Sequence, residues 1–429
     1  MKTKSILDNI LSSTNLNDAF LQVRRNKGAA GVDGMSIDEA DRFIREHRTE
    51  LIQSIRQRQY QPQAVRRVEI PKPTGGVRLL GIPTVIDRVI QQAISQVITP
   101  IFERDFHENS YGFRPNRNAH MAIAQGLNYL NEGYDWIVDI DLEKFFDTVN
   151  HDRLMNLVSR KVDDGDVISL IRKYLVSGVM IDGHYEVTSV GTPQGGNLSP
   201  LLSNIMLNEF DQELETRGLR FVRYADDCIL FVKSEFAAKR VMRSVTRYLE
   251  EILGLKVNAT KSKVTRPNSP DMKFLGFGFY WDRRTGEYKA KPHAMSIQTF
   301  KYKLHQLSKK NWGVDMAYRI HKLNQVIRGW VNYFKIGSMK KVLKLISAHL
   351  RYRLRMCIWS QWKTAKKRIK SLRQLGMSKY HAYKNGHSSK GTARIARSWV
   401  MTTTVTNRLL AKKGLIHPDE YYLKQLRAL

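Results

Sequence analysis

The sequence predicts an α+β protein in which a small antiparallel sheet backed by helices precedes a largely helical region. The first observation is the order of elements from Trp136 to Lys263, which runs strand, helix, hairpin, helix and strand. The second is a hairpin pattern of alternating residues between 65 and 82. The third is a change to helical spacing of the apolar residues beyond Lys291.

Apolar residues at helical spacing predict helices along most of the remaining chain. These helices are expected within residues 5–60, 86–102, 152–176, 201–216, 236–251, 320–334 and 343–358. Prolines and adjacent glycines between 191 and 200 exclude a regular element there. After Ser371 the chain becomes polar and basic, which predicts a linker followed by a small helical module.

The composition is that of a protein with ordinary cores. Of the 429 residues, 42% are hydrophobic and 26% are charged, which predicts about two to four domains. No apolar run approaches the ~20 residues of a membrane span, and the first residues lack the apolar segment of a signal peptide. Cys228 and Cys357 form neither a disulfide framework nor a zinc motif. A cytoplasmic protein without a membrane partner is therefore expected.

Most of the positive charge lies in the last third of the chain. The net charge is +31, and the segment from Lys291 to Leu429 holds 31 lysines and arginines but only 3 acidic residues, a net of +28. Such a polycation predicts an extended polyanionic partner, because the cations otherwise repel one another. A membrane surface would need a lipid-facing stripe, whereas the apolar stripes in this segment fit core seams.

Two adjacent carboxylates, Asp226 and Asp227, connect apolar strands expected at 221–224 and 228–232. Aspartate is common in turns, but strands that are apolar at successive positions are buried on both faces. Acids at the edge of a buried sheet repel each other unless a cation lies between them. A second apolar strand from Trp136 also ends in acids, and this arrangement is typical of a two-metal phosphoryl-transfer site.

These acidic segments resemble motifs of the group II intron reverse transcriptases, or maturases. Tyr224-Ala225-Asp226-Asp227 resembles their Tyr-X-Asp-Asp box, and the segment from Asp141 to Asp147 resembles the preceding motif. The resemblance extends over nearly the whole chain, and several of its motifs are long. It implies a right-hand polymerase with fingers, a palm built on an antiparallel ferredoxin-like or RRM-like sheet, and a helical thumb.

The resemblance implies that Asp141, Asp226 and Asp227 are catalytic and bind two Mg²⁺, with Mn²⁺ as an alternative. Leu142 is expected as a further metal ligand. One ion would activate the primer 3′-hydroxyl, and the other would neutralise charge on the leaving pyrophosphate. Asp139 lies on the same strand face two residues earlier, but the family motif favours Asp141 as the ligand.

A nucleotide site beside these acids is also implied. Its expected members are Lys72, Arg78, Phe146, Gln194, Ala225 and Lys261. Lys72 and Arg78 lie in a segment that resembles the fingers motif and would hold the incoming triphosphate, whereas solvated cations are the alternative. Gln194 is the only long polar side chain in its tight segment, and it would form the floor of the nucleotide site or part of a structural turn.

Two further members of the nucleotide site have alternatives of their own. Phe146 is expected to exclude ribonucleotides by lying against the sugar 2′ position, and a core aromatic is the alternative. Either Lys261 or Lys263 would approach the leaving pyrophosphate, and a surface lysine is the alternative for each.

Nucleic-acid contacts are expected from fingers to thumb. They involve Lys27, Arg114, Gly278, Arg328, Lys363, Lys366 and Lys367. Lys27 lies in a glycine-rich loop that resembles the template-covering loop of the family, and Gly278 lies in a segment that resembles the strand gripping the primer end. Arg114 would reach a phosphate or brace its own loop, with equal weight for both. Arg328 begins a thumb segment that favours the intron family over other reverse transcriptases.

The resemblance divides the chain into expected domains. They are an N-terminal extension with a template-contacting loop (1–62), fingers (63–135), a palm (136–288), a thumb or maturase domain (289–375) and a small basic nucleic-acid-binding module (376–429). No segment resembles the zinc-supported endonuclease that some members carry, so the compact class of the family is expected.

RNA-directed DNA polymerase activity follows from this interpretation, together with a role in intron splicing and mobility in a bacterial cytoplasm. The expected partners are intron RNA as template, a DNA or RNA primer, target DNA and dNTPs, while the oligomeric state stays open. One alternative is a retron or host-defence reverse transcriptase. Another is a maturase that only folds its intron, although buried carboxylates without metal would cost stability.

Overall fold

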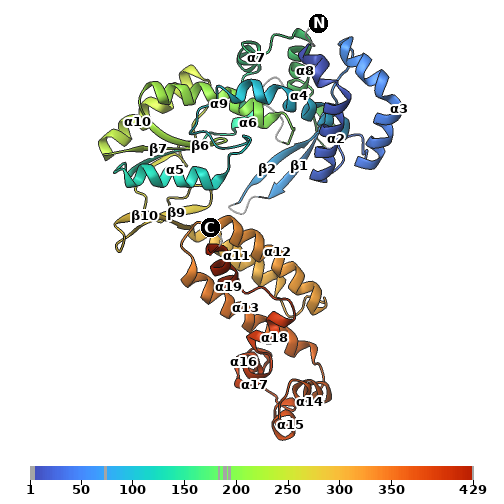
Figure 1. Ribbon diagram of the computed structural model, residues 1–429, viewed down its shortest axis with the longest axis vertical. Coiled ribbons are helices and arrows are strands. Elements are labelled where there is room, and N and C mark those ends of the chain that lie inside the picture. Colours follow the sequence, from blue (N-terminus) through green and yellow to red (C-terminus); the bar gives the residue numbers. More distant parts are fainter. Residues whose placement is uncertain (1–4, 72–74, 182–183, 187–190, 192–194, 428–429) are drawn as a thin grey trace. The chain divides into compact units, whose positions relative to one another are not determined.

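The computed structural model describes the chain except for residues 1–4, 72–74, 182–183, 187–190, 192–194 and 428–429. It forms two compact units, Met1–Arg266 and Pro267–Leu429 (Figure 1). Helices and three sheets occur together, so the α+β prediction is confirmed. The division falls inside the range 136–288 that was expected as the palm.

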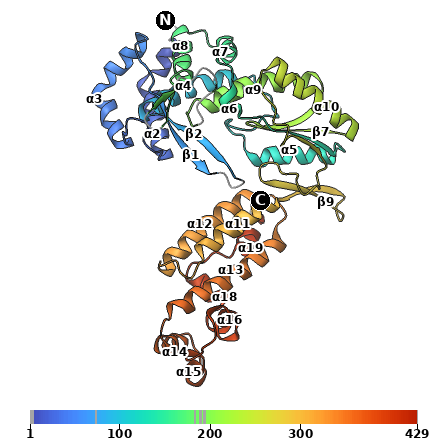
Figure 2. The same cartoon turned by 180° about the vertical axis from the view of Figure 1, so that it is seen from behind.

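The N-terminal helices pack around α4 (Val85–Glu103). They are α1 (Ile6–Ile10), α2 (Ser13–Asn26) and α3 (Ile37–Arg56), and they were expected within residues 5–60. Each begins after a serine whose side chain accepts a backbone N–H, which explains where the helices start. Seen from the front and from behind, α2, α3 and α4 gather beside the hairpin of β1 and β2 (Figures 1 and 2).

The first sheet contains the expected hairpin, β1 (Val65–Pro71) and β2 (Val77–Ile82), paired antiparallel. It continues through β4 (Val179–Ile181) and β5 (His184–Glu186) in the order β2-β1-β4-β5. The β1–β4 pairing is parallel and was not predicted. Strands β4 and β5 have three residues each, which is too short for an alternation of apolar and polar residues to be recognised in the sequence. They become visible only in the tertiary structure.

The second sheet has the order β6-β7-β3-β8, with antiparallel pairing throughout. Its strands are β3 (Trp136–Ile140), β6 (Arg220–Tyr224), β7 (Asp227–Val232) and β8 (Lys263–Thr265). Three helical elements pack near it, namely α5 (Ala119–Asn131), α9 (Ser199–Thr216) and α10 (Glu235–Arg247), which a π-helical turn extends from Tyr248 to Ile252. The predicted order of strand, helix, hairpin, helix and strand is therefore confirmed for this sheet, although β4 and β5 of the first sheet lie between β3 and β6 in the chain.

The helical stretch expected at 152–176 is present, but a break that was not predicted divides it. The structure has two helices there, α7 (His151–Ser159) and α8 (Gly165–Leu175), and the short α6 (Phe145–Thr148) precedes them. The break occurs because the Asp164 side chain accepts the N–H groups of Asp166 and Val167 and so starts a new helix.

The second unit begins with a hairpin of β9 (Phe277–Asp282) and β10 (Glu287–Pro292) and is helical from there on. Its long helices are α11 (Ala294–Leu307), α12 (Met316–Phe334) and α13 (Lys340–Gln361). The short helices are α14 (Ala365–Gln374), α15 (Lys379–Gly386), α16 (Thr392–Arg397), α17 (Trp399–Thr404), α18 (Asn407–Lys412) and α19 (Pro418–Leu426). The linker predicted after Ser371 is thus largely helical.

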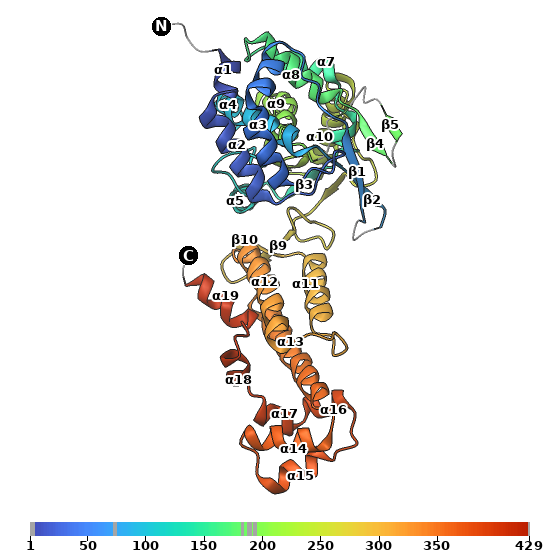
Figure 3. The ribbon, with the colours of Figure 1, turned by 90° about the vertical axis from the view of Figure 1, so that its right-hand side faces the viewer.

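The last helix, α19, returns to pack on α12 and α13 (Figure 3). The Tyr422 hydroxyl donates to the Gly337 carbonyl at 2.9 Å, and the Ser347 hydroxyl donates to the Asp419 carboxylate at 2.6 Å. The final residues therefore share a core with the long helices. No helix among the described residues has the length and apolar character to cross a membrane.

Candidate active site

The acids predicted as catalytic meet at one edge of the second sheet. Strands β3 and β7 pair antiparallel with Ile140 opposite Cys228. Asp141 directly follows Ile140 and Asp227 directly precedes Cys228, so the strand register brings Asp141 next to Asp227. The sheet thus joins two acidic segments that lie far apart in the sequence.

The hairpin between β6 and β7 has a two-residue turn of Ala225 and Asp226, because Tyr224 pairs with Asp227. Ala225 is buried and has a φ of 57°, in the left-handed region that two-residue hairpin turns use. Asp226 is half-buried and Asp227 is exposed. The turn therefore presents both carboxylates at the sheet edge.

A buried arginine holds this turn in place. Arg223 is 1% exposed, and its Nη1 donates to the Ala225 carbonyl at 2.9 Å and to Asn204 Oδ1 at 3.1 Å. Its Nε and Nη2 donate to the two oxygens of Asp211, at 2.7 and 2.5 Å. This pair was not predicted from the sequence, although an arginine inside an apolar strand is a signal for a buried ion pair.

The segment from Ser110 to Arg114 packs directly on the acidic turn. The Tyr111 N–H donates to the Arg223 carbonyl at 2.9 Å. A Cβ added to Gly112 would lie 2.2 Å from the Ala225 nitrogen, so only glycine fits at this contact. The sequence indicated a role for Arg114 of this segment, but it did not predict that the segment supports the turn.

The Arg114 side chain is directed into the protein. Its Nε and Nη2 donate to the Glu103 carboxylate at 3.0 and 2.8 Å, and its Nη1 donates to the carbonyls of His107 and Ser110 at 2.6 and 2.8 Å. These bonds correspond to the bracing alternative, and we therefore leave Arg114 out of the nucleic-acid contacts proposed below.

Asp139, which lies within β3, adds a fourth carboxylate close to this edge. It lies opposite Ile229 of β7 and Lys263 of β8. Burial raises the pKa of Asp139 to about 7, Lys263 lowers it, and the negative charges of Asp227 and Asp141 raise it further. Because these acids repel one another, a cation bound among them would be stabilising.

The two candidate lysines differ in their contacts. Lys261 Nζ donates to Asp141 Oδ2 at 3.1 Å, and its side chain is largely exposed. Lys263 lies opposite Asp139 within β8. Lys261 is therefore the lysine beside the acid that was predicted as a metal ligand, whereas Lys263 partly compensates the buried carboxylate.

The donors at this edge fit divalent cations. Carboxylate oxygens suit Mg²⁺, which commonly binds one or two protein carboxylates together with substrate phosphates. Within the described residues no three histidine, cysteine or acidic side chains are gathered closely enough to hold an ion. The fit therefore rests on the oxygen donors of Asp141, Asp226 and Asp227 and on the repulsion of Asp139 by Asp227 and Asp141.

Leu142 forms an isolated bridge with Val257. The hydrogen bonds on either side of the bridge run from Glu143 N to the Lys256 carbonyl and from Asn258 N to the Asp141 carbonyl, both at 2.8 Å. In such an antiparallel pair the central residues direct their own N–H and C=O groups away from the partner. The Leu142 carbonyl is thus not needed for the pairing.

Three members of the expected nucleotide site cannot be placed. Lys72, Gln194 and the Arg78 side chain lie outside the described part of the structure. Phe146 is described and half-buried, and its ring lies edge-on to Phe145 at 5.3 Å between centroids. Its role as a ribonucleotide gate stays a prediction.

The glycine-rich loop around Lys27 is anchored to the first unit by arginines. Arg88 Nη2 donates to the Ala29 carbonyl at 2.7 Å, and Arg66 Nη2 donates to the Ala30 carbonyl at 2.8 Å. A Cβ on Gly28 would lie 2.1 Å from Arg88 Nη1. These contacts leave the exposed Lys27 side chain at the surface of an ordered loop.

In the second unit most of the predicted nucleic-acid cations are exposed. Arg328 lies on the solvent side of α12, and Lys363, Lys366 and Lys367 are exposed at the start of α14. Gly278 is instead buried in β9, opposite Lys291 of β10. Surface placement is the arrangement that phosphate-binding lysines require.

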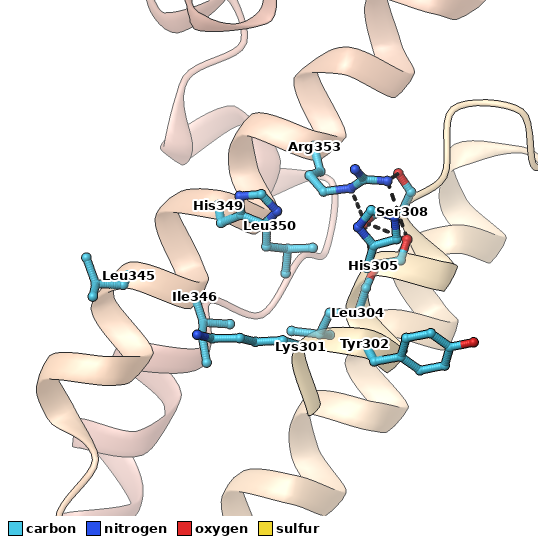
Figure 4. A pocket seen from close by; sticks show the side chains of 10 residues that line it. All are labelled: Lys301, Tyr302, Leu304, His305, Ser308, Leu345, Ile346, His349, Leu350 and Arg353. Carbon is cyan, nitrogen blue, oxygen red and sulfur yellow. Dashed lines mark hydrogen bonds between the residues drawn. The ribbon is translucent and has the colours of Figure 1, made fainter. Parts of the chain in front are cut away.

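A cavity of about 520 Å³ lies between α11 and α13 (Figure 4). Leu304, Ile346 and Leu350 give it apolar walls, and Lys301 lies at its border. Arg353 also lines it, but its Nε donates to Ser308 Oγ at 2.9 Å and its Nη2 donates to the Ser308 carbonyl at 3.1 Å. This arginine is therefore committed to bracing the end of α11.

Two protein families match this chain, each over a different segment. Residues 70–279 match the family described as "Reverse transcriptase (RNA-dependent DNA polymerase)", and residues 297–376 match "Group II intron, maturase-specific domain". Protein YkfC of Escherichia coli (strain K12) is 38% identical over 255 residues, which cover 51% of this chain and 67% of YkfC.

Two further relatives are much longer than the matched region. The Group II intron-encoded protein LtrA of Lactococcus lactis subsp. cremoris is 38% identical over 212 residues, or 49% of this chain and 35% of LtrA. An uncharacterized 91 kDa protein in the cob intron of Schizosaccharomyces pombe is 29% identical over 304 residues, or 57% of this chain and 36% of its own. Together with the polymerase and maturase matches, these relatives show that the chain belongs to the group II intron reverse transcriptases, which are RNA-directed DNA polymerases with a right-hand fold.

Proposed function

We propose that this chain copies RNA into DNA at the sheet edge formed by Asp141, Asp226 and Asp227. The observation that carries the proposal is the β3–β7 register, which brings Asp141 next to the acidic hairpin. Carboxylates in this arrangement suit nucleotidyl transfer, in which the protein contributes mainly positioning and electrostatic stabilisation.

Divalent metal ions are general in this enzyme class, and two Mg²⁺ are proposed for this chain. Asp141, Asp226, Asp227 and the Leu142 carbonyl would hold them. When bound, such ions supply activation of the primer 3′-hydroxyl and neutralisation of the charge on pyrophosphate.

The remaining residues would position the reactants. Arg223 restrains the Ala225 carbonyl, so the backbone of the acidic turn cannot drift when a nucleotide lies against it. The exposed Lys261, bound to Asp141 in the structure, would be free to meet the triphosphate once another cation neutralises that carboxylate. Phe146 would discriminate against the ribose 2′-hydroxyl.

Sequence resemblance alone supports the roles proposed for three residues of the nucleotide site. Lys72 and Arg78 would bind the triphosphate, and Gln194 would form the floor of the site. The loop that carries Lys27 would lie over the template, and the exposed cations of α12 and α14 would hold nucleic acid. All of these contacts are compatible with the nucleic-acid partners that both matched families imply.

A second role in intron RNA splicing and mobility is also proposed. It is favoured by the maturase-specific domain at 297–376 and by the net charge of +28 beyond Lys291. The charge exceeds what about 6–10 phosphate contacts of an ordinary DNA binder require. The parent intron RNA is therefore the proposed structured partner, and target DNA is the proposed substrate of mobility.

The experiment is primer extension on an RNA template with dNTPs and Mg²⁺. Asp226→Asn keeps the side-chain shape but removes a charged ligand, so we expect at least a 100-fold loss of rate, about 2.7 kcal/mol of barrier. Asp163→Asn, at an exposed loop position of the same unit, is the matched control and should retain full activity. Activity of the Asp226 variant within tenfold of the unmodified protein would refute the assignment.

A further inference from the structure

A polar cavity of about 530 Å³ lies in the second unit between α13 and the segment that joins α17 to α18. Its lining consists of Ala348, Arg351, Arg355, Thr402, Thr406, Asn407 and Arg408. Three of these residues carry guanidinium groups, and no carboxylate is among them. The part contributed by α17 and α18 lies beyond the matched maturase range, which ends at residue 376.

One face of α13 forms a wall of the cavity. Ala348, Arg351 and Arg355 follow one another at spacings of three and four residues, which places them on the same side of the helix. Ala348 is small and exposed, so it leaves room for a ligand to approach the two arginines.

Arg355 is the most buried of the three arginines that line the cavity. It is 9% exposed, and its Nε donates to the Val405 carbonyl at 2.9 Å while its Nη2 donates to Asn407 Oδ1 at 3.0 Å. Both acceptors are neutral, so they orient the guanidinium without balancing its charge. Burial lowers the pKa of Arg355, and the neighbouring Arg351 lowers it further.

The buried arginines of this protein differ in how their charge is balanced. Arg114 and Arg223 each bind a carboxylate, whereas Arg319 donates to three carbonyl oxygens at 2.8–2.9 Å and Arg88 to one at 2.7 Å. In the described part of the chain, none of Arg351, Arg355 and Arg408 pairs with an acid. A buried, unbalanced cation is costly, and an incoming anion would remove that cost.

The donor geometry favours a phosphate. Guanidinium groups bind phosphate oxygens through paired, charge-assisted hydrogen bonds. Thr406 Oγ accepts the Leu409 N–H, which leaves its hydroxyl proton available for donation into the cavity. The surrounding unit carries a large positive charge that attracts a polyanion rather than a single small ion.

We propose that the cavity formed by Arg351, Arg355 and Arg408 binds a backbone phosphate of a nucleic acid held by the second unit. The site deepens the proposed function and rests on it, since it identifies one phosphate contact of the maturase unit. RNA and DNA offer the same phosphodiester chemistry, so the experiment uses both.

Binding of ~20-base-pair RNA and DNA duplexes to the full-length protein, titrated against salt, tests this site directly. Arg351 and Arg408 make no hydrogen bond or ion pair within the described residues, so Arg351→Gln/Arg408→Gln should fold normally. We expect at least tenfold weaker binding of the duplex, RNA or DNA, whose phosphate occupies the cavity. The slope of log affinity against log salt concentration should become shallower by about two. Arg240→Gln/Arg243→Gln removes the same charge from exposed positions on α10, outside both the cavity and the basic C-terminal module, and should stay within threefold.

A second variant keeps the proposal falsifiable without removing an arginine. Ala348→Glu places a carboxylate in the cavity one turn before Arg351, so it should raise the melting temperature while weakening duplex binding. Ala317→Glu, at another exposed helical alanine, should change neither. Weaker binding of the RNA duplex, the DNA duplex or both shows which nucleic acid places its phosphate in the cavity. If the cavity variants bind both duplexes as tightly as their control variants do, the proposal is overturned. Because binding is measured without dNTPs, failure of polymerase activity would overturn the proposed function and leave this result intact.

Discussion

Arg223 and Asp211 form a fully buried ion pair directly behind the acidic hairpin, with side chains 1% and 0% exposed. The same guanidinium binds the Ala225 carbonyl, so one residue links the core of the first unit to the turn that carries Asp226 and Asp227. The position of the acids proposed as catalytic therefore depends on a charge that never reaches solvent.

Arg223→Met should reduce the free energy of unfolding by about 3–5 kcal/mol, because it leaves Asp211 buried without its partner. Adding Asp211→Leu should restore most of that stability, since neither charge remains. Primer extension should stay low in the double variant because the Ala225 carbonyl has lost its donor. Urea unfolding and extension rates together separate the two effects, and a double variant with normal activity would show that the turn does not need this donor.

Gly112→Ala should disturb the acidic turn from the opposite side. The added Cβ would meet the Ala225 nitrogen at 2.2 Å, and relief requires movement of one backbone. We expect a primer-extension rate at least tenfold lower and a destabilisation of about 1–3 kcal/mol. Gly313→Ala, where the added Cβ meets no atom within 4 Å, is the control. Equal rates for the two variants would mean that this contact relaxes without cost.

Phe146→Val should increase incorporation of ribonucleotides relative to deoxyribonucleotides, because a smaller side chain leaves room for a 2′-hydroxyl. The measurement is the ratio of dNTP to rNTP incorporation efficiency, with Phe236→Val, at an exposed phenylalanine, as control. An unchanged ratio with intact dNTP use would identify Phe146 as a packing residue beside Phe145.

Asp87 should make the stability of the first unit depend on pH. Burial raises the pKa of Asp87, although bonds from the Tyr60 and Thr84 hydroxyls and from the Gln63 N–H lower it. The folded state therefore holds this proton more tightly than the unfolded state, whose pKa is near 3.8. The contribution of protonated Asp87 to the free energy of unfolding is fully present below pH 3.8. It is lost as the pH rises through the raised pKa of Asp87 in the folded state.

The measurement compares urea unfolding of the unmodified protein and of Asp87→Asn from pH 4 to pH 7. The stability advantage of the unmodified protein should shrink as the pH rises, because only its carboxyl loses a proton. An advantage that grows with pH would mean that the hydrogen bonds outweigh burial and depress the pKa instead.

Neutralising Lys363, Lys366, Lys367 and Lys370 with glutamine should weaken intron RNA binding and splicing at low Mg²⁺, while primer extension on a generic template survives. These lysines are exposed, so the fold should tolerate the change. Arg368 stays unchanged because its guanidinium lies 4.9 Å from the Trp359 ring centre and its Nε donates to the Trp362 carbonyl at 3.0 Å. A parallel loss of extension would assign the lysines to the polymerase track, and no loss of either activity would leave them as solvated surface.

The sequence alone determined the α+β class, the order of elements around the second sheet and the acidic residues of the candidate site. These features follow from local patterns, since strands and helices differ in hydrophobic period and paired acids after apolar strands are visible without any fold. It also located the excess positive charge, which depends on composition only. The charged second unit and the maturase match then agree on a nucleic-acid partner.

Only the tertiary structure decided what supports and surrounds these acids. The Arg223–Asp211 pair, the contact of Gly112 with Ala225 and the inward direction of Arg114 join segments far apart in the chain, and no local pattern encodes their distances. The same holds for the arginines of α13 and α18, which read as surface cations until the fold places them around one cavity. Sequence periodicity assigns a residue to a face of its own element, whereas packing between elements determines which groups that face meets.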